Sequence, residues 1–441
     1  MNVAVIGSGV AGLGAALELS RHGRVTLFEA QARPGGHANT VDVTLDGMQH
    51  PVDTGFLVLN ERTYPRLLAL FEQLNVPLAA SDMSFSASLR PAGVEWSGSN
   101  LNAVFAQRRN LLSPTFLGML RDILRFNKQA THLAMAQDKS SASERHTPLG
   151  DWLIENRYGP GFRNWYLLPM AAAIWSCPMA TMRQFPVGSF ARFFHNHGLL
   201  QVSNRPQWFT VDGGSRRYVE KIINRIDEVR LATPVLEVSR RDYQRTGKVH
   251  VRTANTTQAF DAVVLACHSD QSLNLLSDAD NTEATALAAI RYQPNTACLH
   301  TDSGLMPKNR TAWSAWNYLA DAGSPAADPL SDGEARVSLT YWLNQLQPLP
   351  FRTPVFVTLN PLESPRPESV IQSIRYEHPV FDLGTQHAQQ QIMQQQGSHG
   401  TWFAGAWLGY GFHEDGLMSG QQAAAGILAS NRQQWPATVA A

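Results

Sequence analysis

The chain opens with an apolar run, a glycine-rich turn, an alanine- and leucine-rich stretch and a second apolar run. Residues 3–6 read Val-Ala-Val-Ile, which is typical of a buried parallel strand. The alanines and leucines of residues 11–19 indicate a short helix, and residues 25–28 indicate a second strand. This order predicts one βαβ unit at the start of the chain.

The pattern then changes to that of a hairpin followed by a helix. Residues 41–45 and 49–53 are predicted as two strands, and the Asp-Gly pair between them suits a tight turn. Asn60 is a good N-cap for a helix over residues 63–74. Residues 83–96 alternate as strands around a Pro-Ala-Gly turn.

From residue 100 to residue 200 the chain is rich in Leu, Met, Phe and Trp and reads as helical. Two interpretations of this stretch stay open, because such helices either line a pocket for an apolar substrate or form ordinary core. The helix around residues 111–126 carries Arg121 and Arg125, so it either packs normally or rests on a membrane surface.

The length and composition of the chain limit which architectures and which partners can be expected. A chain of 441 residues is too long for one ordinary core, so we expect two lobes. Lysine plus arginine equals aspartate plus glutamate, at 36 each, which gives no electrostatic argument for nucleic acid. No apolar run approaches 18 residues, and the first strand begins at residue 3, so we expect neither a membrane span nor a signal peptide.

The three cysteines are scattered and lack the spacing of a metal site. We therefore expect no metal, a reducing and cytoplasmic compartment, and thiols that serve as small buried hydrophobes. They are Cys177, Cys267 and Cys298.

The glycine-rich turn is the strongest chemical signal. Gly7-x-Gly9-x-x-Gly12 directly follows the first strand and opens the helix, which is the required context of a dinucleotide fingerprint. Gly7 makes the turn, Gly9 lets the backbone approach a pyrophosphate, and Gly12 allows close packing of helix and strand. Glu29 ends the second strand, where a carboxylate binds the ribose hydroxyls, so FAD or NAD is favoured over NADP.

Two more glycine-rich stretches suggest further contact with the nucleotide. Arg33-Pro-Gly35-Gly36 follows the βαβ unit, and it indicates either a second backbone approach to the cofactor or a plain turn. Near the C-terminus a short strand ends at Gly405, a glycine-punctuated loop follows, and a helix opens around Gly416. A second helix N-terminus of this kind suits the pyrimidine edge of a flavin, because the reduced ring is anionic.

Together these motifs resemble the flavin-containing amine oxidase and phytoene desaturase superfamily, over nearly the whole chain. Within it, the stretches 35–37, 53–56 and 411–416 resemble a bacterial branch usually described only as NAD/FAD-binding proteins or amine oxidases and often found near cyclopropane fatty acid synthases. The resemblance implies an α/β fold with a Rossmann-like FAD-binding lobe, an inserted α+β substrate lobe, and noncovalent FAD. His37, His413 and the cysteines are conceivable attachment points if the flavin is covalent.

The resemblance also implies how the lobes and the site are distributed. The FAD-binding lobe would comprise residues 1–80, 206–295 and 386–441, and the substrate lobe would comprise residues 81–205 (helical, apolar) and 296–385 (strands). The cofactor-binding residues would be Gly7, Gly9, Val10, Ala11, Gly12, Glu29, Ala30, Arg33, Gly35, Gly36, His37, Thr54, Gly55, Val235, Gly405, Gly416 and Leu417.

A flavin accepts hydride, so the protein must orient a C–H bond and supply a base where a proton is also lost. His413 and Glu414 are the candidate catalytic residues, although Glu414 or Asp415 would serve equally well as a helix cap. Trp407, Tyr410 and Phe412 are candidates for the substrate pocket.

Three functions are compatible with these residues. The first is an oxidoreductase that oxidises, desaturates or isomerises a fatty-acyl or lipid-like substrate, with possible peripheral contact at the inner face of the membrane. The second is an amine oxidase, for which Trp407 and Tyr410 would form the aromatic pair, and the lysine would be Lys308, which does not align with that role. The third is a flavin-bound partner protein without turnover. The oligomeric state is not predicted.

Overall fold

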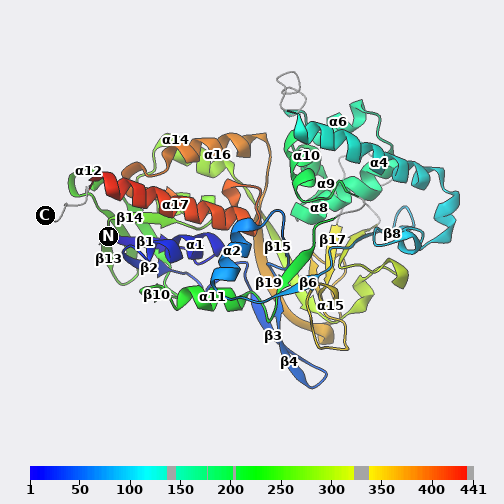
Figure 1. The fold of residues 1–441 in the computed structure, drawn as a ribbon, viewed down its shortest axis with the longest axis horizontal. Helices are drawn as coiled ribbons and strands as arrows, with labels where there is room; N and C mark the ends of the chain where they lie inside the picture. Colours follow the sequence, from blue (N-terminus) through cyan, green and yellow to red (C-terminus); the bar gives the residue numbers. More distant parts are fainter. Residues whose placement is uncertain (137–145, 176, 202–204, 322–336, 435–441) are drawn as a thin grey trace.

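The computed structural model describes residues 1–136, 146–175, 177–201, 205–321 and 337–434. It confirms the predicted mixed α/β fold, with one lobe built on a parallel sheet and a second built on a larger sheet covered by helices (Figure 1). In Figure 1 the parallel sheet lies on the left with both termini, and the helix-covered sheet lies on the right.

The parallel sheet has the strand order β10-β2-β1-β14-β20, and every neighbouring pair is parallel. Its apolar runs are buried on both faces. Val3 and Val5 face a core that includes α1 and α17, while Ala4 and Ile6 face a core that includes α14 and α16. The strands are β1 (Asn2–Ile6), β2 (Arg24–Phe28), β10 (Glu228–Arg230), β14 (Ala262–Leu265) and β20 (Thr401–Phe403).

Helices on both sides complete this lobe. The sheet lies between α1 (Val10–Leu19) with α17 (His413–Gln434) and α14 (Asn281–Ala289) with α16 (Leu383–Gln395). A three-stranded antiparallel sheet of β11 (Val235–Ser239), β12 (Val249–Thr253) and β13 (Thr257–Phe260) packs beside it. The remaining helices of this part are α11 (Arg216–Ile223), α12 (Tyr243–Thr246) and α13 (Ser269–Leu275).

The larger sheet has the order β19-β15-β18-β17-β16-β7-β8 and draws its strands from two separate stretches of the chain. One face, which includes Ala87, Tyr318 and Leu339, belongs to the same core as the overlying helices. Its strands are β7 (Phe85–Leu89), β8 (Val94–Ser97), β15 (Tyr292–His300), β16 (Trp316–Ala320), β17 (Val337–Trp342), β18 (Phe356–Leu359) and β19 (Val370–Pro379).

We call the helices over this sheet the helical layer. It comprises the helices between residues 101 and 196, where the sequence predicts helical structure. The elements are α3 (Leu101–Val104), η1 (Arg108–Leu112), α4 (Pro114–Met135), α6 (Leu149–Glu155), α7 (Pro160–Phe162), η3 (Arg163–Leu167), α8 (Leu168–Trp175), α9 (Met179–Arg183) and α10 (Val187–Asn196).

The predicted hairpin is present as β3 (Thr40–Leu45) and β4 (Met48–Asp53). A small sheet of β5 (Leu59–Asn60), β9 (Trp208–Val211) and β6 (Leu78–Ser81) follows the order β5-β9-β6. A short α15 (Leu343–Leu346) follows β17. Within the described ranges, no helix combines the length and the apolar character needed to cross a membrane.

The predicted capping of the helix after Asn60 is wrong. Helix α2 (Pro65–Gln73) begins after Tyr64, while the Asn60 Oδ1 atom accepts hydrogen bonds from the backbone N–H groups of Arg62 and Thr63 in a preceding turn. The first turn of α2 is capped instead by Glu414, whose two carboxylate oxygens accept from the N–H groups of Arg66 (2.9 Å) and Leu67 (3.0 Å).

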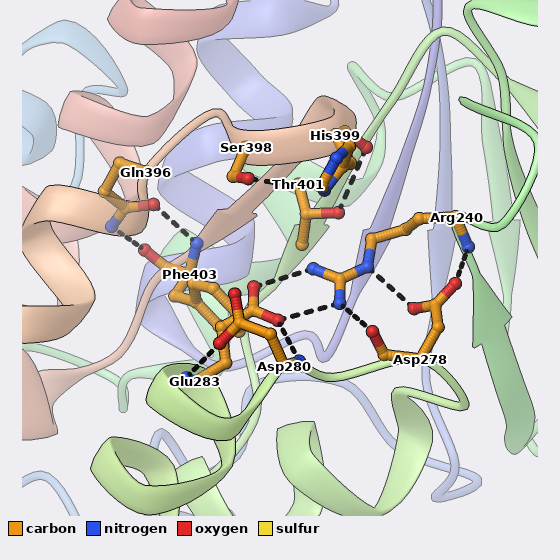
Figure 2. A network of polar contacts seen from close by, with 9 residues as sticks. All are labelled: Arg240, Asp278, Asp280, Glu283, Gln396, Ser398, His399, Thr401 and Phe403. Atoms are coloured by element: carbon orange, nitrogen blue, oxygen red, sulfur yellow. Dashed lines mark hydrogen bonds and ion pairs between the residues drawn. The ribbon is translucent and has the colours of Figure 1, made fainter. Parts of the chain in front are cut away.

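A buried ion-pair network joins the end of β11 to the start of α14, near the amino ends of β14 and β20 (Figure 2). Arg240 directly follows β11, and its guanidinium donates to Asp278 at 2.8 Å and to both carboxylate oxygens of Glu283 at 2.7 and 2.8 Å. Glu283 also belongs to the capping box that starts α14. Nearby, the Gln396 amide pairs with the backbone N–H and C=O of Phe403 in β20.

We predict that Arg240→Met lowers the free energy of unfolding by about 3–5 kcal/mol, because it leaves the carboxylate of Glu283 buried without its partner. Urea unfolding followed by tryptophan fluorescence measures this change. The matched control is Arg252→Met, which removes the partly exposed pair with Glu237 and should cost at most about 1 kcal/mol. Equal effects of the two substitutions would contradict the prediction.

Candidate functional site

A cavity of about 640 Å³ extends from the carboxyl end of the parallel strands into the helical layer. One end is lined by the turn after β1, the end of β2 and the start of β11. The other end is lined by apolar and aromatic side chains, among them Ile174, Phe193, Leu199, Trp208 and Trp316.

At the first end, the start of helix α1 is shaped to receive an anion. Gly9 is the N-cap of α1, and no side chain caps this helix, so its first N–H groups face the cavity. A Cβ placed on Gly9 would meet no heavy atom within 4 Å, which shows that the space beside the turn is open. Gly12 instead packs against the turn, because its Cβ would lie 1.8 Å from the Gly7 carbonyl oxygen.

Glu29 ties the glycine turn to β2. Its Oε2 atom accepts hydrogen bonds from the Ser8 N–H (2.9 Å) and the Ser8 hydroxyl (2.5 Å), and its Oε1 atom accepts from the Gln31 N–H (2.8 Å). Ala30 and Val235 line the cavity beside it. The carboxylate is therefore positioned at the edge of the open space, as the fingerprint predicts for a ribose contact.

The second glycine pair meets the first. Gly35 has a φ of +109° and donates its N–H to the Ser8 carbonyl, and a Cβ on Gly36 would lie 3.2 Å from the Gly9 Cα. Gly36 and His37 line the cavity, whereas Gly35, which is buried, and Arg33, which is exposed, do not. Arg33 supports the turn by donating to the Gly36 carbonyl at 2.9 Å.

Three other residues predicted to contact the cofactor do not line the cavity and instead pack behind its wall. Thr54 is buried, and its hydroxyl donates to the Asn39 carbonyl, while its neighbour Gly55 does line the cavity. Gly416 and Leu417 lie where α17 packs against α1, and a Cβ on Gly416 would approach Val10 Cγ1 to 2.7 Å.

The loop after β20 closes the middle of the cavity. Gly405 lines the cavity and donates its N–H to the Ser419 hydroxyl at 2.9 Å. Asp415 shapes the rest of the loop, because one of its oxygens accepts from the N–H groups of Tyr410 and Phe412. Burial raises the pKa of Asp415 to about 6.

The two candidate catalytic residues have different surroundings. His413 lines the cavity, stacks on Phe56 at a ring-centroid distance of 3.9 Å, and pairs through Nε2 with the Tyr218 hydroxyl at 2.9 Å. Burial lowers the pKa of His413 to about 3, so it is a neutral imidazole and a weak base. Glu414 lies outside the cavity wall, and its carboxylate caps α2, which is a structural role.

The predicted aromatic pair is not assembled by this geometry. The Trp407 ring is buried, and its Nε1 donates to the Cys267 carbonyl at 3.0 Å. Tyr410 lies outside the cavity wall, near Phe193. Phe412 lines the apolar end of the cavity and stacks on Phe193 at a ring-centroid distance of 5.0 Å. Of the three predicted pocket residues, Phe412 therefore lines the apolar end and Trp407 lines the middle of the cavity.

The polar centre around His378 is not predicted by any motif of the sequence. This residue lines the cavity together with His37, His268, Tyr292 and Glu377. These residues come from segments far apart in the chain, and their types follow no recognisable spacing. The pairing of β15 with β19 brings Tyr292 beside Glu377 and His378, and the loop after β2 and the start of α13 add His37 and His268.

A hydrogen-bond chain fixes the tautomer of His378. The Thr296 backbone N–H donates to the Asn360 Oδ1 atom, so the Asn360 amide group must donate to the Asn295 Oδ1 atom. The Asn295 amide nitrogen then donates to the Gln293 carbonyl (3.1 Å) and to His378 Nδ1 (2.9 Å). The chain starts at a backbone N–H, which can only donate, and also reaches a backbone carbonyl, which can only accept. Each amide between them must therefore donate toward His378.

His378 is therefore neutral and carries its proton on Nε2. Burial lowers the pKa of His378 to about 4, in agreement with that state. Since Nδ1 is occupied, Nε2–H is the group with which His378 can bind a hydrogen-bond acceptor in the cavity. His37 lies beside it at a ring-centroid distance of 5.2 Å, and the Nε2 atom of His37 is buried with no partner among the described residues.

These features fit a flavin nucleotide. The uncapped start of α1 and the open space at Gly9 suit a pyrophosphate, Glu29 suits a ribose, and the unpartnered Nε2 atom of His37 remains for a polar ring. Cys267 also lines the cavity, and burial raises the pKa of its thiol to about 11. Among the described residues, no group of three His, Cys, Asp or Glu is arranged to hold a metal ion.

Comparisons with known proteins agree with this geometry. The family model for flavin containing amine oxidoreductases matches residues 10–428. A carotenoid phi-ring synthase from Streptomyces griseus is 28% identical over 288 residues, which cover 60% of this chain and 52% of that protein. The chain thus spans about half the length of this curated relative.

Solved structures show the same fold. A CLA-producing fatty acid isomerase from P. acnes aligns with a TM-score of 0.66 at 14% identity, over 96% of this chain and 97% of that one. A cyclohexylamine oxidase from Brevibacterium oxydans IH-35A aligns with a TM-score of 0.68 at 15% identity, over 98% and 99% of the two chains.

We predict that Gly9→Glu abolishes flavin binding, because the new side chain would enter the open space beside α1 and place a negative charge where the pyrophosphate binds. The ratio of flavin absorbance to protein absorbance measures this loss. Gly118→Glu is the control, since a Cβ there also meets no heavy atom within 4 Å but lies on α4, away from the cavity. A yellow Gly9→Glu protein would show that the nucleotide binds elsewhere.

We also predict that His413 makes stability depend on pH. In the unfolded chain its pKa is about 6.5, whereas burial lowers the pKa to about 3 in the folded protein. As pH falls below about 6.5, only the unfolded state takes up the proton, so this contribution to stability is complete above pH 6.5 and is lost progressively below it.

Replacing His413 with glutamine should remove this loss. As the pH is lowered from 6 to 4, the free energy of unfolding should fall less steeply in His413→Gln than in the wild type. The difference between the two slopes should be up to about 1.4 kcal/mol per pH unit. Urea unfolding at several pH values measures both slopes. Identical slopes would mean that His413 is protonated as readily in the folded protein as in the unfolded chain.

Proposed function

Since the chain belongs to the flavin containing amine oxidoreductase family and is thereby an FAD-dependent oxidoreductase, we propose that its substrate is a fatty-acyl or other lipid-like chain. The reaction begins with removal of hydride from a C–H bond of that chain. Loss of a proton from the neighbouring carbon then leaves a double bond, and return of the hydride to another carbon instead gives a redox-neutral isomerisation.

The residues at the first end of the cavity would hold the FAD. The N–H groups at the start of α1, with Gly9, would bind the pyrophosphate, Glu29 the ribose, and Val235 would lie by the adenine. When bound, the flavin supplies a hydride acceptor at N5. His37, His378 and the Gly405 loop would surround its ring and exclude water.

The single observation that carries the proposed substrate is the apolar far end of the cavity. Its wall consists of side chains such as Ile174, Phe193, Leu199 and Phe412, which bind hydrocarbon by burial alone. Among the described residues that line the whole cavity, the only acidic ones are Glu29 and Glu377, and none is lysine or arginine. A charged head group therefore has no cation to pair with inside, so the chain of the substrate, rather than its head, would occupy this end.

Two further observations favour an acyl chain over an amine. Lys308 is exposed and lies outside the cavity wall, and Trp407 and Tyr410 do not face one another across it. One solved structure with this fold is described as a fatty acid isomerase. The cyclohexylamine oxidase has the same fold, so amine oxidation is the alternative that an experiment must separate.

The test is anaerobic bleaching of the bound flavin. We expect unsaturated or methyl-branched acyl lipids to reduce the flavin and a panel of amines to leave it oxidised, while dithionite reduces it in either case. Bleaching by amines alone would replace the proposal with amine oxidation. A flavin that only dithionite reduces would count against net hydride removal and require a product analysis for isomerised lipid.

A variant links the result to the apolar end of the cavity. Met83 lines the cavity and is half-buried, so Met83→Glu should leave the fold intact while placing a charge where the hydrocarbon binds. Lipid bleaching should become much slower, whereas reduction by dithionite should not change. Unchanged lipid bleaching would place the acyl chain elsewhere.

A further inference from the structure

The outer surface of the helical layer exposes an unusual set of large apolar side chains. Leu101 is 79% exposed, Leu112 is 88% exposed and Leu124 is 62% exposed. Leu111, Leu117 and Met135 are also exposed, so six such side chains come from one segment of 35 residues. Single exposed leucines are normal on a protein surface, but a concentration of this kind marks an interaction site.

Helix α4 arranges part of this set in one stripe. Leu117, Arg121, Leu124, Lys128 and Met135 follow one another at spacings of four, three, four and seven residues, which places them on one face of a helix. All five are exposed. The opposite face packs into the core of the helical layer through Phe116, Met119, Phe126, Ala130 and Leu133. The helix is thus anchored on one side and presents alternating apolar and basic side chains on the other.

The charge of this segment differs from that of the whole chain. Residues 101–135 contain five arginines and lysines but one acidic residue, which gives a net charge of +4, although the formal net charge of the whole chain is zero. The acidic residue, Asp122, is buried and accepts from the Gly159 N–H, and its Oδ1 atom lies 3.7 Å from Arg121 and 3.5 Å from Arg125. One carboxylate leaves the excess of positive charge in place. Arg108 and Arg109 donate to the uncharged partners Asn102 and the Gly93 carbonyl, so their charges are not neutralised there.

We call the exposed side chains of Leu101, Arg108, Arg109, Leu111, Leu112, Leu117, Arg121, Leu124, Lys128 and Met135 the basic apolar face. Figure 1 shows α4 at the outer edge of the helical layer, at the end of the molecule opposite the parallel sheet and the two termini. The neighbouring α10 packs against α4 and carries Phe193, which lines the apolar end of the cavity. This face and that end of the cavity therefore belong to the same layer.

We propose that the basic apolar face docks on the surface of an anionic lipid bilayer. The exposed leucines and Met135 would enter the boundary between head groups and acyl chains, and the arginines and Lys128 would pair with the phosphates. The mixture of leucines with an excess of cations fits a bilayer better than an acidic protein surface, because a bilayer offers apolar and anionic groups side by side at any register. This inference concerns binding and does not depend on the reaction proposed above.

The experiment is flotation of the FAD-loaded protein with vesicles. Vesicles of phosphatidylcholine containing phosphatidylglycerol should carry the wild type, and added salt or phosphatidylcholine alone should weaken binding. Leu112→Glu and Leu124→Glu should each reduce vesicle binding tenfold or more. Arg121→Glu should do the same, because it changes the charge of the face by roughly two units. These side chains are exposed, so the flavin spectrum and thermal midpoint of each variant should match those of the wild type.

The control is Leu236→Glu, which changes an exposed leucine on β11 in the other lobe and should bind vesicles as the wild type does. Failure of the wild type to float with anionic vesicles would overturn the proposal. Equal loss in the Leu236→Glu control, or no loss in the three variants, would overturn it as well. Flavin bleaching by detergent-dispersed lipid, measured separately, tests the proposed reaction whatever the vesicle result.

Discussion

The close packing of α1 against α17 is the contact on which the rest of the structure depends. A Cβ on Gly14 would lie 2.6 Å from a Leu417 methyl carbon, and a Cβ on Gly420 would lie 2.0 Å from the Ala11 carbonyl oxygen. Such approach is possible only where one helix has no side chain at the point of contact. It brings the loop that follows β20 beside the glycine turn that follows β1, and so it creates the middle of the cavity. The two ends of the chain thereby build one wall.

The cavity has few charged groups in its wall. Burial keeps the imidazoles of His37, His378 and His413 uncharged, and hydrogen bonds hold the carboxylates of Glu29 in the wall and of Asp415 in the adjoining loop in fixed orientations. In a medium of low dielectric constant, such fixed dipoles interact strongly with a bound ring and need no reorganisation. The same absence of mobile charge suits an apolar substrate, because few polar groups must be desolvated when it enters.

The features that could be predicted from the sequence are those that residues close together in the chain determine. The βαβ unit, the turn at Gly9 and the position of Glu29 follow from a contiguous stretch of about thirty residues, and the structure has them as predicted. The capping of α2 by Glu414 was not foreseen, because its hydrogen-bond partners, Arg66 and Leu67, are nearly 350 residues away. The polar chain that ends at His378 was not foreseen for the same reason. It exists only because β15 and β19 are paired in one register.

The order of the strands has a consequence for how the protein is made. The parallel sheet takes its strands from the beginning, the middle and the far end of the chain, and β20 pairs with β14 rather than with a neighbour in sequence. A chain emerging from a ribosome therefore carries an unfinished sheet and an uncovered α1 until residues 401–434 have been synthesised. Contacts between such distant segments form slowly, and the apolar surfaces stay exposed in the meantime. The apolar surfaces of the unfinished sheet are therefore open to wrong contacts during that interval, and the part of the cavity wall that the Gly405 loop supplies forms only after it.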